Sequence, residues 1–227
     1  MPSVTIGVTA PHTIPAHFLT PFLALLNHTG QKVGNVSVSM STHYCTYEAR
    51  NICARAAIKN GSDYLFFLDA DILAPPDTIE RLVARDKDII SGPYHLKSIP
   101  YRPLAYMKSG KEGEYNMCTD IEEEKLYEVD GVGGGCLLIK RHALEKVGDP
   151  YFSFALNGKN IGEDLYFCSK AQKAGCGIWY DNTIPEVKHF GAAIGFNDFK
   201  AWNFHIKRGA VKFNAGSENP NTTKNKE

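Results

Sequence analysis

The first ninety residues alternate short apolar runs with segments in which apolar positions recur every three or four residues. The runs at residues 4–8, 33–40 and 64–68 are rich in β-branched and aromatic residues and predict strands. The segments between them, which begin at Thr13 and Thr46, predict helices. Residues 64–68 are apolar on both faces, as in a central strand covered by helices on both sides. The pattern therefore predicts an α/β fold with an open, mostly parallel sheet flanked by helices.

The pattern changes after residue 92. Short apolar segments separated by glycine, proline and charged residues continue to residue 139, and they predict a smaller, partly antiparallel region beside the sheet. Helical spacing returns at residues 141–147 and again from Gly162 onward, and two short strands follow. Residues 215–227 contain almost no core-forming side chain and predict a disordered tail.

Composition narrows the class of protein. The chain has 227 residues, of which 43% are hydrophobic and 22% charged, as in globular domains. Basic and acidic residues number 25 each, so no overall basic field exists and we expect no stable nucleic-acid binding. The six cysteines form no C-x-x-C pair, which argues against a zinc ribbon. Neither a signal peptide nor a membrane-spanning apolar stretch is visible, so we expect a cytoplasmic protein.

Two aspartates, Asp69 and Asp71, follow the most buried predicted strand directly. Ligands of open α/β sheets bind beyond the carboxyl ends of the strands, and a period of two places both carboxylates on one side. Carboxylates this close repel each other unless a positive group lies beside them, and Mn²⁺ or Mg²⁺ bound to a diphosphate would supply it. The spacing alone is not specific, because Asp86 and Asp88 share it without a preceding strand. A cluster at the entry of the next helix is the alternative interpretation.

Four ordered blocks together are more specific: YEARNICARAAIKNGSDYLFFLDADI, DGVGGGCLLIKR, GEDLYFCSKAQKAG and VKHFG. They resemble the small GT-A glycosyltransferases, especially soluble relatives of the inverting family 2, over about residues 3–195. The resemblance implies a Rossmann-like catalytic domain over residues 1–214, with a nucleotide-binding half at 1–92 and an acceptor half at 93–194. It also implies a nucleotide-sugar donor, a UDP-sugar rather than a GDP-sugar, and Mn²⁺ or Mg²⁺ as cofactor.

The resemblance carries roles to individual residues. It implies that Asp69 faces the nucleotide and that Asp71 binds the metal ion, with Asp69 and His189 as further ligands. Four other positions match those that often line the nucleotide in the family: Thr9, Pro11, Arg50 and Asn51. A surface charge on a helix is the alternative for Arg50. A hydrogen-bonded core histidine is the alternative for His189.

Glu163 and Asp164 resemble the family's acidic pair at a helix start. A transferase needs a carboxylate to accept the proton of the acceptor hydroxyl, and a helix N-terminus keeps such a group ionised. We expect Asp164 to be this base and Glu163 to orient it or bind the acceptor, whereas ordinary helix capping is the alternative. A glycine run at residues 131–135 would let the acceptor approach the backbone, as the resemblance implies, or it would simply form a tight bend. The acceptor-binding glycines are Gly133, Gly134 and Gly135.

The remaining features bear on the type of reaction. The chain lacks the Q-x-x-R-W block of processive synthases, so we expect transfer of a single sugar. Attack by an acceptor hydroxyl that Asp164 deprotonates would give inversion, and retention is the alternative. Residues 195–214 mix aromatic and basic side chains and predict a lid over the donor, a contact with a membrane surface, or a packing helix. A sugar nucleotidyltransferase and a catalytically silent binding module are alternatives. The former is disfavoured because residues 9–13 contain no Gly-rich phosphate loop. The acceptor stays open.

Overall fold

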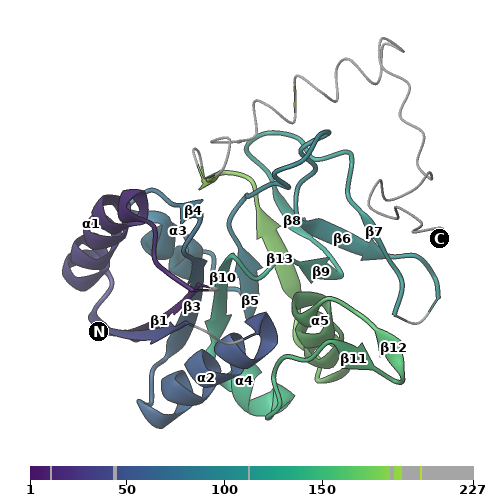
Figure 1. Ribbon diagram of the computed structural model, residues 1–227, viewed down its shortest axis with the longest axis horizontal. Helices are drawn as coiled ribbons and strands as arrows, with labels where there is room; N and C mark the ends of the chain where they lie inside the picture. The colour runs from purple at the N-terminus through teal and green to yellow at the C-terminus, as the bar shows by residue number, and fades with distance from the viewer. Residues whose placement is uncertain (11, 43–44, 112, 185–186, 191–199, 201–227) are drawn as a thin grey trace, which may run out of the picture.

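A seven-stranded sheet forms the centre of the protein, as a computed structural model shows (Figure 1). The structure describes residues 1–10, 12–42, 45–111, 113–184, 187–190 and 200. Across the sheet the strands follow the order β2 (Asn35–Ser41), β1 (Ser3–Thr9), β3 (Tyr64–Asp69), β10 (Cys136–Lys140), β5 (Ile89–Ser91), β13 (Ile178–Asp181) and β8 (Leu126–Glu128). The three early strands predicted from the sequence are confirmed.

The sheet is mostly parallel, as predicted. Strand β1 pairs in parallel with β2 and β3, and β13 pairs in parallel with β5. Strand β10 is antiparallel to both β3 and β5, and β8 is antiparallel to β13. The prediction that residues 136–139 end a region beside the sheet was wrong, because β10 lies at its centre. Leu137, Leu138 and Ile139 are all buried, so this strand, like β3, needs cover on both faces.

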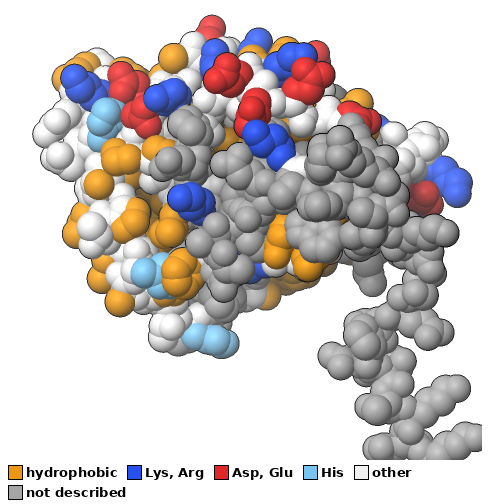
Figure 2. Space-filling model, turned by 90° about the horizontal axis from the view of Figure 1, so that it is seen from above, with side chains coloured by type: hydrophobic (Ala, Val, Ile, Leu, Met, Phe, Trp, Pro, Cys, Tyr) orange, Lys and Arg blue, Asp and Glu red, His pale blue; other side chains and the backbone are white. Residues whose placement is uncertain are grey.

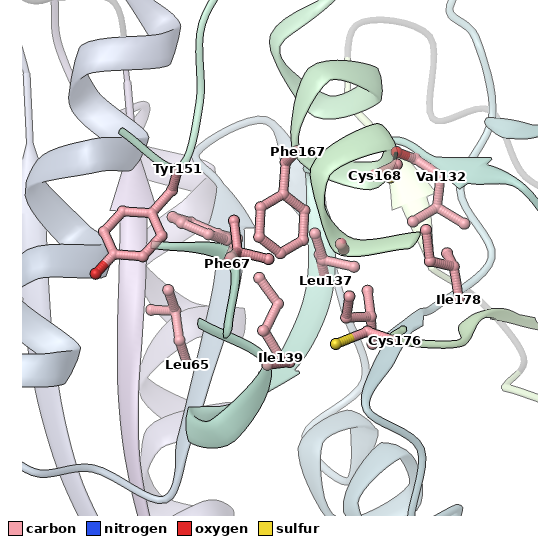
Figure 3. Close-up of a cluster of buried hydrophobic side chains, with 14 of the residues drawn as sticks. Leu65, Phe67, Val132, Leu137, Ile139, Tyr151, Phe167, Cys168, Cys176 and Ile178 are labelled. Carbon is pink, nitrogen blue, oxygen red and sulfur yellow. Dashed lines mark hydrogen bonds between the residues drawn. The ribbon is translucent and has the colours of Figure 1, made fainter. Parts of the chain in front are cut away.

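Helices cover both faces of the sheet (Figure 1). They are α1 (Ala16–Lys32) and α3 (Thr78–Ala84) on one face and α2 (Thr46–Lys59), α4 (Arg141–Val147) and α5 (Glu163–Lys173) on the other. Phe66 of β3 packs under the first pair of helices. Phe67 packs against the second set, in the cluster that Figure 3 shows. Helix α1 begins after Pro15 and not at Thr13, because a proline disfavours helical geometry in the residue before it.

Smaller sheets lie beside the main one. Strands β7 (Tyr115–Met117), β6 (Ala105–Lys108) and β9 (Gly131–Val132) form the predicted antiparallel region. Two short pairs complete the fold: β11 (Ala155–Leu156) with β12 (Lys159–Asn160), and β4 (Ile72–Leu73) with β14 (Lys188–His189). The segment at 125–130, predicted in the accessory region, instead supplies edge strand β8 of the main sheet. Pairing of β14 with β4 brings His189 opposite Ile72, next to Asp71.

The surface has no single charge sign. On the face that Figure 2 shows, most of the described basic side chains lie among acidic ones, in keeping with the formal net charge of zero. No helix in the described ranges is long and apolar enough to cross a membrane. The predicted lid or packing helix at 195–214 lies outside the described residues except for Lys200, whose ammonium pairs with Glu123. The predicted disordered tail at 215–227 also lies outside them.

Candidate functional site

The predicted site lies where β1 and β3 end. Thr9 and Asp69 are opposite each other in the strand register, and the Thr9 hydroxyl donates a hydrogen bond to the Asp69 carboxylate. A cavity of about 480 Å³ opens beside them. Its lining includes Thr9, Thr13, Thr46, Ala49, Asp69 and Asp71. Open α/β sheets bind ligands at this edge, and the mixture of small, apolar and acidic groups suits a nucleotide. Pro11, another predicted nucleotide contact, lies outside the described residues.

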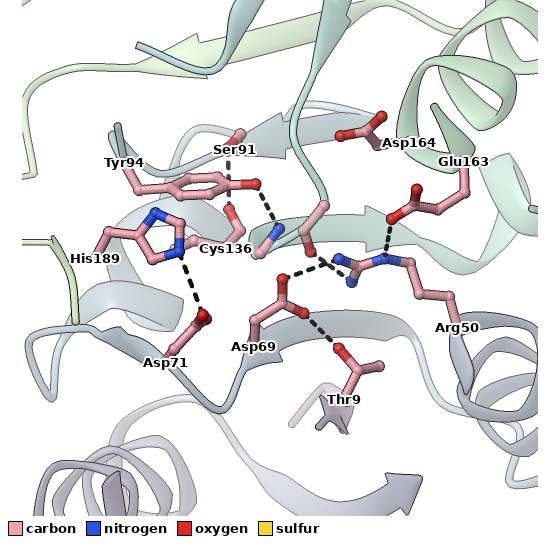
Figure 4. A network of polar contacts seen from close by, with 12 residues as sticks. Thr9, Arg50, Asp69, Asp71, Ser91, Tyr94, Cys136, Glu163, Asp164 and His189 are labelled. Carbon is pink, nitrogen blue, oxygen red and sulfur yellow. Dashed lines mark hydrogen bonds and ion pairs between the residues drawn. The ribbon is translucent and has the colours of Figure 1, made fainter. Parts of the chain in front are cut away.

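Arg50 of α2 connects the two predicted parts of the site (Figure 4). Its guanidinium is almost fully buried above the ring of Phe67. It donates to Asp69 Oδ2 at 3.0 Å, to the Gly134 carbonyl at 2.9 Å and to Glu163 Oε1 at 3.4 Å. Burial lowers the pKa of Arg50, but the two carboxylates outweigh burial and raise it. Arg50 is therefore not a surface charge, and its donors are directed at protein groups.

Asp71 lies two residues beyond the end of β3 and has different partners. Lys97 Nζ lies 2.6 Å from Asp71 Oδ2, and His189 Nε2 lies 3.4 Å from the same oxygen. Burial raises the pKa of Asp71, but the hydrogen bonds and charges of His189 and Lys97 outweigh it and lower the pKa to about 2. The sequence predicted that a positive group must relieve the repulsion between Asp69 and Asp71. In the structure two separate side chains, Arg50 and Lys97, do so.

The chemistry of His189 fits a divalent cation. Its Nδ1 lies 2.8 Å from the His95 carbonyl, which can only accept, so Nδ1 carries a proton. Nε2 faces Asp71: it is a donor to this carboxylate when protonated, and it would offer a lone pair to a cation once that proton is lost. Metal-bound histidines commonly have this arrangement. Two neighbouring ligands of an octahedral cation lie about 3 Å apart, since each bond is about 2.1 Å long, and the Nε2 to Oδ2 separation of 3.4 Å is close to that.

The protein alone supplies few ligands. Within the described ranges, no three His, Cys, Asp or Glu side chains gather as a metal-binding group. Asp69, predicted as a further ligand, is hydrogen-bonded to Arg50 and Thr9, and its role as a ligand stays a prediction. Mg²⁺ and similar ions are often held by one or two protein ligands, with substrate phosphates and water completing the shell. Asp71 and His189 fit a cation of this kind.

Helix α5 places the acidic pair at its first turn. Glu163 reaches Arg50 (Figure 4). Asp164 accepts a hydrogen bond from the backbone amide of Leu165 at 2.8 Å. Burial, with a smaller effect of Glu163, raises the pKa of Asp164 to about 6, although Arg50 opposes the shift. The sequence argument expected the helix N-terminus to keep this carboxylate ionised. Burial works against that effect, and the result is a carboxylate whose basicity suits proton abstraction near neutral pH.

The glycine run packs against the site. A Cβ on Gly134 would lie 2.7 Å from Arg50 Cζ, and one on Gly135 would lie 2.9 Å from Asp69 Oδ2. The Gly135 amide also donates to the buried Tyr94 hydroxyl at 2.7 Å. These glycines therefore make room for Arg50, Asp69 and Tyr94, which is a stronger requirement than a tight bend. Contact between the glycines and an acceptor stays a prediction. The sequence did not identify Tyr94 as a residue of the site, because Tyr94 belongs to no motif.

Alanine at position 133 tests this packing. A Cβ there would overlap the Tyr94 hydroxyl and lie 2.9 Å from Tyr94 Cζ, while the hydroxyl is held by the Gly135 amide. Overpacking of this kind costs about 1–3 kcal/mol, so we expect Gly133→Ala to lower the free energy of unfolding by that amount in urea denaturation. Gly30→Ala in α1 is the control, because a Cβ at Gly30 meets nothing, and we expect it not to destabilise the protein. Gly61→Ala is less suitable, because the positive φ of Gly61 disfavours alanine. Equal stability of both variants and the wild type would contradict the packing argument.

Asn51, next to Arg50, faces a different part of the protein. Its amide nitrogen donates to the Phe152 carbonyl at 2.9 Å, and its oxygen accepts from the backbone amides of Tyr151 and Phe152. The side chain is buried and all of these bonds are to the backbone of the loop before β11. Asn51 thus supports that loop and does not face the cavity.

Comparisons with known proteins bear on the fold. No family model matches the chain, and no curated protein matches it by sequence. Among solved structures, A197 from STIV has a TM-score of 0.54 and 22% identity over 84% of this chain and 86% of its own. An apo UDP-glucose pyrophosphorylase has a TM-score of 0.51 and 9% identity over 93% of this chain and 100% of its own.

A weaker likeness, with a TM-score of 0.44, is to a mutant Drosophila β1,4-galactosyltransferase 7 in complex with manganese, UDP-Gal and xylobiose. At this level of similarity it carries no argument. The likenesses above 0.5 concern the fold alone, since their sequence identities are low. Together with the strand order, they agree with the fold class predicted from the sequence: the chain has a mixed α/β, GT-A-like fold.

Proposed function

We propose that this protein is a metal-dependent glycosyltransferase that moves a single sugar from a nucleotide-sugar donor, a UDP-sugar by preference, to an acceptor hydroxyl with inversion. One observation carries the proposal. The Asp71–His189 pair and the cavity lie at the carboxyl edge of the sheet, and Arg50 links this edge to the acidic pair of α5. Donor, cation and base therefore have separate places in one connected site.

The donor nucleotide lies in the cavity between β1 and the start of α2. Thr9 and Asp69 line this cavity, and the hydrogen bond from Arg50 fixes the position of the Asp69 carboxylate. Asp71 and His189 Nε2 would hold Mn²⁺ or Mg²⁺, and the cation would supply Lewis acidity at the departing nucleoside diphosphate. Because Asp71 stays ionised down to low pH, its carboxylate is available to a cation throughout the physiological range.

Asp164 accepts the proton of the acceptor hydroxyl as that oxygen attacks the anomeric carbon. Its raised pKa, about 6, makes it a better base than an ordinary aspartate and leaves it mostly ionised at neutral pH. Glu163 is held by Arg50 and so helps to fix the first turn of α5. With the base on the acceptor side and the nucleotide leaving from the other side, the anomeric configuration inverts.

Binding of UDP tests the donor site. We expect UDP with Mn²⁺ to raise the melting temperature of the wild-type protein, since a ligand that binds only the folded state stabilises it. The shift should be much smaller with UDP in EDTA, and smaller with GDP than with UDP. A Mn²⁺-independent shift of the same size would contradict the proposed role of the cation.

Asp71→Asn tests the cation ligand. Loss of a metal ligand's charge should weaken Mn²⁺-dependent UDP binding by at least about tenfold in calorimetric titration. Asp77→Asn is a matched control, because Asp77 lies in the loop before α3 and pairs with Arg81 on the surface. Unchanged UDP affinity in Asp71→Asn would contradict the role of Asp71 as a ligand of the cation.

The product distinguishes the proposed reaction from that of a nucleotidyltransferase, whose fold this chain shares in the UDP-glucose pyrophosphorylase comparison. A glycosyltransferase incubated with UDP-glucose and Mn²⁺ slowly releases UDP to water, whereas a nucleotidyltransferase given pyrophosphate releases UTP. A binding module releases neither. Chromatography of the nucleotides therefore separates the three functions without knowledge of the acceptor.

A further inference from the structure

We propose that Lys97 is a resident counter-ion of Asp71, which neutralises this carboxylate in the cation-free site and binds the donor diphosphate once a divalent cation is held by Asp71. The inference rests on the proposed function, because it needs a cation and a diphosphate at Asp71. It adds a residue that no sequence motif marks. The inference also predicts an order of binding: the cation binds first, because Lys97 pairs with Asp71 and becomes available to the nucleotide only after the cation has displaced it.

The loop between β5 and β6 brings Lys97 to Asp71. At the base of this loop, the Tyr94 hydroxyl accepts the amide hydrogen bond of Gly135. One residue further, the His95 carbonyl holds Nδ1 of His189. Two residues beyond that, Lys97 Nζ lies 2.6 Å from Asp71 Oδ2. One short loop thus orients the histidine and places an ammonium at the carboxylate.

The ammonium lies at the oxygen that a cation would need. Lys97 Nζ and His189 Nε2 both approach Asp71 Oδ2, at 2.6 and 3.4 Å. A divalent cation bound to this oxygen at about 2.1 Å would lie within about 5 Å of the ammonium and repel it. Lys97 and the cation therefore compete for one carboxylate oxygen.

The ion pair is weak enough to be displaced. The side chains of Lys97 and Asp71 are 42% and 40% exposed, and pairs this open to solvent contribute about 0–1 kcal/mol. A doubly charged ion with an additional nitrogen ligand outweighs such a pair. Asp71 is the only carboxylate within ion-pair distance of Lys97 in the part of the chain that the structure describes. A displaced Lys97 is thus left with its charge uncompensated at the edge of the donor site.

A diphosphate compensates that charge. Lysine is a compact charge on a flexible four-carbon chain and is well suited to phosphate oxygens. The cavity beside Asp71 is where the proposed donor lies. The cation and Lys97 then share the diphosphate's negative charge, so the same side chain opposes cation binding before the nucleotide arrives and favours nucleotide binding afterwards.

Lys97→Met tests both halves, because the inference predicts effects of opposite sign. Mn²⁺ binding to the nucleotide-free protein, followed by the electron paramagnetic resonance signal of free Mn²⁺, should tighten by about two- to fivefold, as expected from the loss of a weak competing pair. UDP binding at saturating Mn²⁺, measured by calorimetry, should weaken by about tenfold through the loss of a charge-assisted contact. Lys97→Arg should bind UDP nearly as well as the wild type.

Lys59→Met is the matched control, because Lys59 is an exposed lysine at the last residue of α2 and its replacement removes the same charge away from the site. It should leave both affinities within about twofold of the wild type, roughly the additivity error of distant sites. Unchanged or weaker Mn²⁺ binding in Lys97→Met would overturn the competition, and unchanged UDP binding would overturn the phosphate contact. If the wild type itself bound neither Mn²⁺ nor UDP, the proposed function would fail instead.

Discussion

Replacement of Arg50 by methionine is expected to lower the free energy of unfolding by up to about 3–5 kcal/mol, because it leaves two partly buried carboxylates without their positive partner. Asp69 and Glu163 would both lose their positive partner, and the Gly134 carbonyl would lose its donor. We expect UDP binding and donor hydrolysis to be lost as well, since both halves of the site depend on these carboxylates. Urea denaturation monitored by circular dichroism measures the first effect.

Arg55→Met is a matched control on the same helix. Arg55 pairs with Glu48 and Asp149, but its side chain is 47% exposed, so its loss should cost less than about 1 kcal/mol. Arg50→Lys keeps the charge but cannot bridge three acceptors, and we expect intermediate stability. Comparable stability of Arg50→Met and Arg55→Met would show that Arg50 does not hold the site together.

Replacement of Asp164 by asparagine is expected to lower turnover by about 10²- to 10⁴-fold, the usual contribution of a general base. The asparagine oxygen can still accept the Leu165 amide, and the side chain has nearly the same shape. UDP affinity with Mn²⁺ should therefore stay within about twofold of the wild type. Release of UDP as the sugar passes to the acceptor, or to water, measures turnover. Normal turnover together with normal UDP binding would show that Asp164 is not the general base.

The same variant should be more stable than the wild type at neutral pH. Burial raises the pKa of Asp164 from 3.8 to about 6, so the folded state binds this proton more tightly than the unfolded state. The stability contributed by the proton is fully present below pH 3.8 and is lost as the pH rises through about 6. The asparagine of the variant has no charge to desolvate. Its advantage in stability should therefore be absent below about pH 4, grow as the pH rises, and reach its full value of at most about 3 kcal/mol above about pH 6.

Wild-type turnover should respond to pH in the same range. A base works only when ionised, so the rate should fall about tenfold for each pH unit below the pKa of Asp164. A rate that is flat between about pH 4.5 and 7 would argue against a base with this pKa. Thermal melts of wild type and Asp164→Asn over the same pH range provide the independent check.

Much of the fold was predictable because its signals are local. The apolar run of β3 and the two aspartates after it follow from residues adjacent in the sequence. Helix α4 was predicted at its observed bounds, Arg141–Val147. The antiparallel placement of β10 was not predictable in this way, because a strand that is apolar on both faces can occupy any central position in a sheet.

The site was predictable only in outline. Acidic residues at a strand end and at a helix start carry local patterns, and the resemblance ordered them into one site. The partners of these residues come from distant parts of the chain and have no such pattern. Lys97 and Tyr94 belong to a loop whose sequence indicates only irregular structure, and the burial of Arg50 follows from packing between α2, β3 and α5.

The position of β10 has a consequence for synthesis of the protein on the ribosome. Strand β3 ends at Asp69, but the neighbour that completes its pairing begins only at Cys136. Strands β5, β13 and β8 connect to the first three strands through β10 alone. Until residue 140 has emerged from the ribosome, β2, β1 and β3 can therefore form only one side of the sheet, and the apolar edge of β3 that pairs with β10 stays unpaired. Such long-range closure slows folding and leaves that edge open to association between incomplete chains.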